Sequence, residues 1–300
     1  MQKVAVIGAG TMGNGIAHVF AQKGFDVHLI DISPAALEKA ISSIHSNLGR
    51  MVAKGTISEA DKTAALGRIK TFSNLQEGVE NVELVVEAAT EQEALKKKIF
   101  ADLDHFAPSS CILATNTSSI SITGIGSATN RPGQVIGMHF MNPVPVMQLV
   151  EVIRGYSTTD AVTATVMEVS RLLGKTPVEV NDYPGFVANR ILMPMLNEAI
   201  YALFEGVAGV KEIDTVMKLG MAHPMGPLQL ADFIGLDVCL SILKVLYQGL
   251  GHPKYAPCPL LVNMVAAGKL GVKSGEGFYV YQSGSKDLIP ASRFSHPANR

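Results

Sequence analysis

The chain has 300 residues, of which 47% are hydrophobic and 17% charged. A chain of this length and hydropathy can fill the cores of two domains, which excludes a globally disordered protein. Its 25 basic and 26 acidic side chains leave a formal charge of -1, so we expect no nucleic-acid or membrane partner, and any anion site must be local.

Short β-branched runs alternate with helical patterns from Lys3 to about Val180, which predicts a doubly wound, mostly parallel α/β sheet. After Pro184 the apolar residues follow helical spacing, with only a short aromatic run, GFYVY, near the end. We therefore predict a sheet domain over residues 1–183, an all-helical domain over 184–282, and an extended tail over 283–300. The predicted strands contain VAVIG, DVHLID, ELVVEA, CILAT, QVIGMHF, MQLVEVI and TPVEV.

A glycine-rich segment, Gly8-Ala9-Gly10-Thr11-Met12-Gly13, follows the first predicted strand directly and opens a predicted helix. In that context Gly8 permits a tight turn, Gly10 lets a pyrophosphate approach the backbone, and Gly13 allows close helix–strand packing. The helix N-terminus adds N–H groups and a positive dipole. The segment predicts a dinucleotide site on a Rossmann-type sheet, and a glycine turn without a ligand is the alternative.

Asp31 ends the second predicted strand, where an acidic side chain accepts hydrogen bonds from the adenosine ribose and repels a 2'-phosphate. No Arg or Lys follows directly in Ile32-Ser33-Pro34, so the sequence favours NAD over NADP. The alternative is that Asp31 caps the helix that starts at Pro34.

Residues 34 to about 68 are more than an ordinary crossover needs, and we predict a helical pair inserted into the sheet domain. One face of its first helix is apolar, and the segment is locally basic. This predicts a second phosphorylated ligand, for instance the nucleotide end of coenzyme A, although solvated charges are the alternative. The basic residues are Lys39, Arg50, Lys54, Lys62, Arg68 and Lys70.

Polar residues follow two later strands, at the edge where doubly wound sheets bind ligands. Asn116-Thr117-Ser118-Ser119 follows CILAT, and His139 ends QVIGMH. Glu151 lies inside the neighbouring apolar run MQLVEVI, where a carboxylate is costly to bury unless it is paired. We expect His139 to be its partner, because a Glu–His pair suits a general base. A purely structural pair is the alternative.

The sequence does not contain the motifs that several other enzyme classes require. The sequence has no GxSxG elbow and no HExxH, so we expect neither a serine hydrolase nor a metal site. Three cysteines without a CxxC spacing favour a reducing compartment, and no apolar run is long enough to predict a membrane span or a signal peptide. These features predict a cytoplasmic protein.

With these motifs the chain resembles a known family, the L-3-hydroxyacyl-CoA dehydrogenases, and within it the bacterial 3-hydroxybutyryl-CoA branch. The resemblance covers about residues 1 to 282 and rests on long blocks in the same order. These are VAVIGAGTMGNGIA, ATNTSS, GMHFMNPVPVMQLVEV, DYPGFVANRILMPMLNEA, HPMGPLQLADFIGLD and VKSGEGFYVY.

The resemblance implies roles for individual residues. The family's catalytic histidine and its carboxylate partner fall on His139 and Glu151, and its active-site serine and asparagine fall on Ser118 and Asn189. Contacts with NAD are implied for Glu91, Lys96, Asn116, Ser118, Asn142 and Lys273. Contacts with coenzyme A are implied near Lys54, and less specifically Ser42 or Arg50, while Ser118, His139 and Asn189 would meet the reacting end of the substrate.

Together these features predict NAD-dependent oxidation of an (S)-3-hydroxyacyl-CoA of short chain to the 3-ketoacyl-CoA, and the reverse reaction. One alternative is a dehydrogenase of a free hydroxy acid, of the gulonate type. The other is a non-catalytic dinucleotide-binding protein of the lens-crystallin kind. Apolar residues of the second domain also predict a homodimer formed through it. They are Ile191, Met195, Leu196, Ile200 and Leu203, with the segment 228–246.

Overall fold

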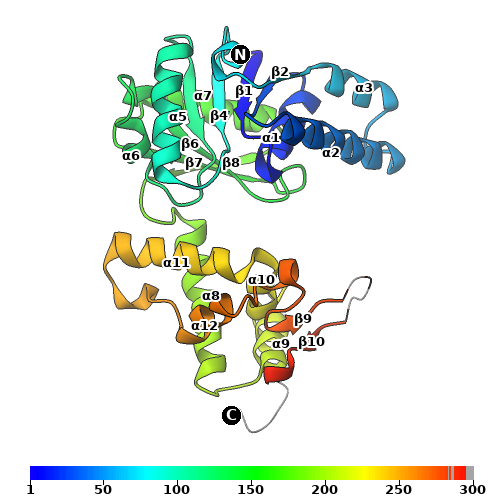
Figure 1. Ribbon diagram of the computed structural model, residues 1–300, viewed down its shortest axis with the longest axis vertical. Coiled ribbons are helices and arrows are strands. Elements are labelled where there is room, and N and C mark those ends of the chain that lie inside the picture. The colour runs from blue at the N-terminus through cyan, green and yellow to red at the C-terminus, as the bar shows by residue number, and fades with distance from the viewer. Residues whose placement is uncertain (283, 285–286, 295–300) are drawn as a thin grey trace. The chain divides into compact units, whose positions relative to one another are not determined.

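The computed structural model describes residues 1–282, 284 and 287–294, and it divides into two compact units, Met1–Phe186 and Val187–Arg300 (Figure 1). Each unit has its own hydrophobic core. Within the predicted tail, Ile289–Pro290 forms β10, which pairs with β9 (Tyr279–Val280) of the second unit. Residues 283, 285–286 and 295–300 lie outside the described residues.

The first unit is built on one eight-stranded sheet of order β3-β2-β1-β4-β5-β6-β7-β8, which confirms the predicted fold class. Strands β1 to β6 run parallel, β7 runs antiparallel to β6, and β8 runs parallel to β7. The strand order reverses between β1 and β4, the switch point at which such sheets bind nucleotides. The strands are β1 Lys3–Ile7, β2 Asp26–Ile30, β3 Ile69–Phe72, β4 Leu84–Glu87, β5 Ile112–Thr115, β6 Val135–Phe140, β7 Leu149–Arg154 and β8 Thr176–Asn181.

Helices cover both faces of this sheet because its strands are apolar on both faces. Alternate residues of β1 enter different cores: Val4 and Val6 belong to a core shared with α1, α2 and α7, whereas Ala5 and Ile7 belong to a core shared with α5 and α6. Figure 1 shows α1 and α5 on opposite sides of β1 and β4. The helices are α1 Thr11–Gln22, α2 Pro34–Ala53, α3 Glu59–Gly67, α4 Leu75–Gly78, α5 Glu93–Phe106, α6 Ile122–Gly126 and α7 Asp160–Leu172.

The long connection between β2 and β3 forms the helices α2 and α3. Ser33 begins α2, since its side chain accepts a hydrogen bond from the N–H of Ala36 and Pro34 follows at the first helical position. Ser58 and Asp61 begin α3 with a reciprocal capping box. Leu37, Ile44 and Leu48 of the predicted apolar face are buried together with Ala40, whereas Ile41 and Met51 of that face are partly buried.

The second unit is helical, and one glycine divides an apolar stretch that has continuous helical spacing. The helical spacing from Pro227 to Leu246 is interrupted at Gly235, whose φ is +103°, and this ends one helix and begins the next. Periodicity alone did not reveal this break. The helices are α8 Ala188–Phe204, α9 Val210–Gly220, α10 Pro227–Ile234, α11 Leu236–Leu250 and α12 Pro259–Ala266.

Two buried aspartates organise the end of this unit. Asp214 accepts hydrogen bonds from the N–H groups of Leu228 and Gln229, and Asp232 accepts them from those of Phe278 and Tyr279. Burial raises the pKa of Asp232 to about 6, although these N–H groups hold it down. The blocks HPMGPLQLADFIGLD and VKSGEGFYVY therefore meet around structural carboxylates.

None of the helices in the described part of the chain combines the length and the hydropathy that a bilayer span requires.

Candidate active site

The glycine turn between β1 and α1 has the geometry of a phosphate site. Gly8 has a φ of +95°, and a Cβ placed on it would lie 2.7 Å from the carbonyl oxygen of Ala88. A Cβ on Gly13 would lie 1.7 Å from the oxygen of Gly8, whereas a Cβ on Gly10 would meet no atom within 4 Å. Gly8 and Gly13 therefore permit the turn, and Gly10 leaves open space at the N-terminus of α1, where the helix dipole favours an anion.

Asp31 lies beside this turn, just beyond the end of β2. Its Oδ2 accepts a hydrogen bond from the N–H of Ala9 at 2.7 Å, and its Oδ1 accepts one from the N–H of Ser33 at 2.9 Å. Ser33, and not Asp31, is the N-cap of α2. The alternative interpretation of Asp31 as a helix cap is therefore not needed. These residues fit a dinucleotide: open space for the phosphates lies next to a fixed carboxylate for the ribose.

The ends of β4 and β5 are joined by a network of carboxylates and hydroxyls. Glu91 accepts hydrogen bonds from the Thr117 hydroxyl at 2.6 Å, from the N–H and hydroxyl of Ser118 at 2.9 and 3.2 Å, and from the Ser119 hydroxyl at 3.2 Å. Its carboxylate lies 3.5 Å from the ammonium of Lys96. The structure thus brings together three predicted site residues, Glu91, Lys96 and Ser118.

Burial acts to raise the pKa of Glu91, but the charge of Lys96 and the hydrogen bonds from Thr117, Ser118 and Ser119 outweigh it and lower that pKa. Glu91 is therefore a carboxylate at neutral pH. Ser118 donates both its N–H and its hydroxyl proton to Glu91, which fixes the position of the serine after β5.

His139 and Glu151 face each other across the antiparallel strands β6 and β7. The two residues are direct partners in the ladder, and Nδ1 of His139 lies 2.8 Å from Oε2 of Glu151. Their relative exposures are 8% and 2%, so both are buried. The hydrogen bond to Nδ1 fixes the orientation of the ring and directs Nε2 away from the carboxylate.

Two asparagines flank this histidine strand. Asn116, directly after β5, accepts a hydrogen bond from the N–H of Phe140 through Oδ1 at 2.9 Å. Asn142 follows β6, is exposed, and precedes a cis peptide bond to Pro143. The buried ammonium of Lys175 donates to the carbonyl oxygens of Val144 and Met147 and thereby holds the loop between β6 and β7.

The remaining predicted residues belong to other elements. Asn189 is buried in the first turn of α8, and Lys273 forms an ion pair with Asp237; all three belong to the second unit. Arg50 and Lys54 lie at the C-terminal end of α2 and are exposed. Neither touches Asp31 or the glycine turn in the described hydrogen bonds and ion pairs, and their predicted contacts with coenzyme A stay predictions.

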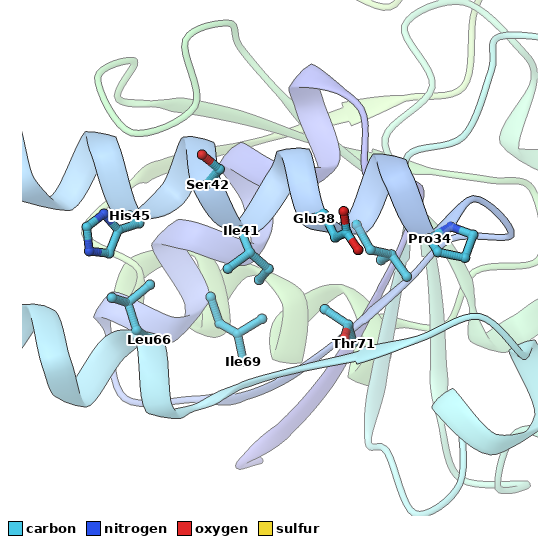
Figure 2. A pocket seen from close by; sticks show the side chains of 9 residues that line it. Pro34, Glu38, Ile41, Ser42, His45, Leu66, Ile69 and Thr71 are labelled. Carbon is cyan, nitrogen blue, oxygen red and sulfur yellow. The ribbon is translucent and has the colours of Figure 1, made fainter.

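A groove of about 750 Å³ lies between α2, α3 and β3 (Figure 2). Ser42 lies along this groove with Glu38 and His45, above the apolar side chains of Leu66 and Ile69. Arg50 and Lys54 do not line it. The contact with coenzyme A that the resemblance implies for Ser42 stays a prediction.

Glu87, the last residue of β4, was not predicted from the sequence to belong to the site. Its side chain is completely buried and binds Lys96 through both carboxylate oxygens, at 2.7 and 2.9 Å. The signal was present in ELVVEA, since a carboxylate that ends an apolar strand needs a partner, as Glu151 does.

A dinucleotide site that shares one edge of a sheet with a carboxylate-held histidine belongs to the class of nicotinamide-dependent dehydrogenases. The chain is a member of the 3-hydroxyacyl-CoA dehydrogenase family. The sequence model of that family's NAD binding domain matches residues 3–183, and the model of its C-terminal domain matches residues 185–281. NAD is thus the cofactor that the first unit binds.

Relatives of similar length carry related names. A "Probable 3-hydroxybutyryl-CoA dehydrogenase" of Deinococcus radiodurans is 56% identical over 93% of this chain and 100% of its own. A 3-hydroxybutyryl-CoA dehydrogenase of Bradyrhizobium diazoefficiens is 53% identical over 94% of this chain and 96% of its own. The crystal structure of (S)-3-hydroxybutyryl-CoA dehydrogenase from Ralstonia eutropha matches with a TM-score of 0.92 and 50% identity, covering 94% of this chain and 100% of that one.

The glycine turn gives a paired prediction. Gly13→Ala places a methyl group on the oxygen of Gly8 and should lower the free energy of unfolding by about 3 kcal/mol. Gly10→Ala meets no atom of the protein and should leave the melting temperature unchanged, yet it should weaken NAD binding roughly ten-fold because its methyl group enters the phosphate space. Thermal melts and NADH fluorescence titrations measure both effects. Equal stability of the two variants would contradict the prediction.

Proposed function

We propose that this protein oxidises (S)-3-hydroxyacyl-CoA thioesters of short chain, such as 3-hydroxybutyryl-CoA, to 3-ketoacyl-CoA with NAD+, and catalyses the reverse reaction. The observation that carries the proposal is the 2.8 Å contact between His139 and Glu151 within an NAD-binding unit. The names of the relatives support the substrate class.

In the proposed mechanism His139 is the general base. Glu151 holds Nδ1 in its protonated form, so Nε2 presents a lone pair that accepts the proton of the C3 hydroxyl. NAD+, held by the glycine turn and Asp31, supplies the hydride acceptor when it is bound. Glu151 then stabilises the imidazolium, and in reduction the same Nε2 returns the proton to the ketone oxygen.

Ser118 and Asn189 orient the reacting oxygen in this proposal. The Ser118 hydroxyl lies 3.2 Å from Glu91, and by turning its proton to the substrate it can donate to the C3 oxygen, whose own proton goes to His139. The basic face of α2, with Arg50 and Lys54, binds the phosphates of coenzyme A. Glu91, Lys96, Asn116, Asn142 and Lys273 complete the NAD site.

The decisive experiment is an NADH absorbance assay with acetoacetyl-CoA, followed in the other direction by comparing 3-hydroxybutyryl-CoA with free 3-hydroxybutyrate and gulonate. We expect turnover of the two thioesters and at least a hundred-fold lower kcat/KM for the free acids, because these lack the coenzyme A contacts. Preference for a free acid would indicate a gulonate-type enzyme. Binding of NADH without any turnover would indicate a crystallin-like protein.

The catalytic pair gives a second prediction. His139→Gln and Glu151→Gln should each reduce kcat by roughly 10²-fold or more, in line with general acid–base contributions, while NADH still binds. His105→Gln and Glu179→Gln change the same residue types at exposed positions and should retain full activity. Stopped assays and NADH titrations separate the two effects. Undiminished turnover in both active-site variants would reject the assignment.

We further propose a cytoplasmic homodimer that forms through the second unit. The three cysteines are buried free thiols, which suits a reducing compartment. Of the apolar residues that suggested a dimer, Leu196 and Ile200 lie in the core, whereas Ile191 and Phe233 are 68% and 61% exposed. Other exposed apolar side chains of this unit also support the interface. They are Phe204, Val207, Val216, Leu219 and Met221.

Light scattering tests this assembly. A dimer through the second unit gives a mass of twice 31.9 kDa, and Leu219→Lys should shift it toward the monomer, since a charge in an apolar interface is costly. A monomeric mass for the unchanged chain would contradict the proposal.

A further inference from the structure

The proposed mechanism gives no role to the buried carboxylate of Glu87. Glu87 accepts hydrogen bonds from Lys96 through both oxygens, from the N–H of Ala89 at 2.7 Å and from the Thr115 hydroxyl at 2.7 Å. Every one of these contacts is a donor, so Glu87 is bound as a carboxylate. The side chain of Lys96 is 1% exposed, and its ammonium is matched by this carboxylate.

The same ammonium also lies 3.5 Å from Glu91. One lysine therefore stands between two carboxylates, and the cluster Glu87–Lys96–Glu91 carries one net negative charge. That charge is directed toward solvent, because Glu87 is completely buried whereas the side chain of Glu91 is 39% exposed.

The topology fixes which half of the cofactor lies near this charge. A dinucleotide crosses the sheet at the switch point between β1 and β4. Asp31 receives the adenosine ribose on the β2 side, so the nicotinamide half extends toward β4 and β5. Glu91 follows β4 and is bonded to the residues that follow β5.

We propose that the Glu87–Lys96–Glu91 cluster makes the site discriminate between the two redox forms of the cofactor, favouring NAD+, whose nicotinamide ring carries a positive charge, over NADH, whose ring is neutral. The inference rests on the binding of NAD by the first unit and not on the identity of the substrate. Glu91 is the residue that presents the charge, and Glu87 and Lys96 hold it in place.

The test is an equilibrium measurement on Glu91→Gln, which keeps the shape of the side chain and removes its charge. NADH affinity is measured by fluorescence titration, and NAD+ affinity by displacement of NADH. We expect the ratio Kd(NAD+)/Kd(NADH) to rise about five-fold, as expected for loss of one partly solvated charge near the ring. Glu91→Asp retains the charge and should restore most of the ratio.

Glu93→Gln is the matched control. Glu93 lies two residues away, is 60% exposed and pairs with Lys97 at 2.7 Å, so this variant loses the same charge at nearly the same place in the chain. We expect its ratio to stay within two-fold of the unchanged protein. A similar shift in both variants would indicate a general surface field and would overturn the proposal.

One further result would count against it. If Glu91→Gln weakens both forms equally, or abolishes both, Glu91 positions the cofactor without sensing its charge. If the unchanged protein binds NADH but lacks activity toward acyl-CoA, the proposed substrate is wrong while the ratio can still be measured. Failure of the two proposals is therefore distinguishable.

Discussion

The burial of Glu151 is the constraint on which the site depends. A carboxylate with 2% exposure must be paired, and in the described sheet β6 and β7 form the one antiparallel pair, which places His139 directly opposite it. The antiparallel direction of β7 relative to β6 therefore has two effects. It satisfies the buried charge, and it holds an imidazole in one orientation at the edge of the sheet where the parallel strands end.

The parts of the fold that could be predicted are those whose physics is local in sequence. The glycine turn was predictable because Gly8 and Gly13 satisfy steric needs created by their own strand and helix. The pairing of His139 with Glu151 could be inferred because the two residues occupy neighbouring apolar runs. From the sequence, either Asp31 or Ser33 could be the N-cap of α2, and in the structure the N-cap is Ser33.

The missed features depend on elements that are distant in sequence or on backbone angles that leave no periodic signal. Glu87 meets Lys96 and Thr115 only when β4, α5 and β5 are assembled. Gly235 interrupts an apolar pattern that continues on both sides of it, because a positive φ changes direction without changing composition. The coenzyme A contact of Ser42 was implied by the family resemblance and stays a prediction; the structure shows Ser42 at the groove beside β3, which Arg50 and Lys54 do not line.

The two carboxylates of the site can be understood through the charge that the proposed reaction moves. When the hydroxyl is oxidised, one positive charge disappears from the bound cofactor and one appears on His139, so the total charge of the site does not change. Glu151 lies 2.8 Å from the ring that gains the charge. In the proposed orientation of the cofactor, the nicotinamide ring that loses the charge lies near Glu91, whose carboxylate is 3.5 Å from the ammonium of Lys96. Each of the two positive charges, on the nicotinamide ring before the reaction and on His139 after it, then has a carboxylate nearby, and this matters because an unpaired charge in a partly buried site is costly. On this proposal, the stabilisation that Glu91 gives to NAD+, relative to the stabilisation that Glu151 gives to the imidazolium, sets the equilibrium between the two bound states.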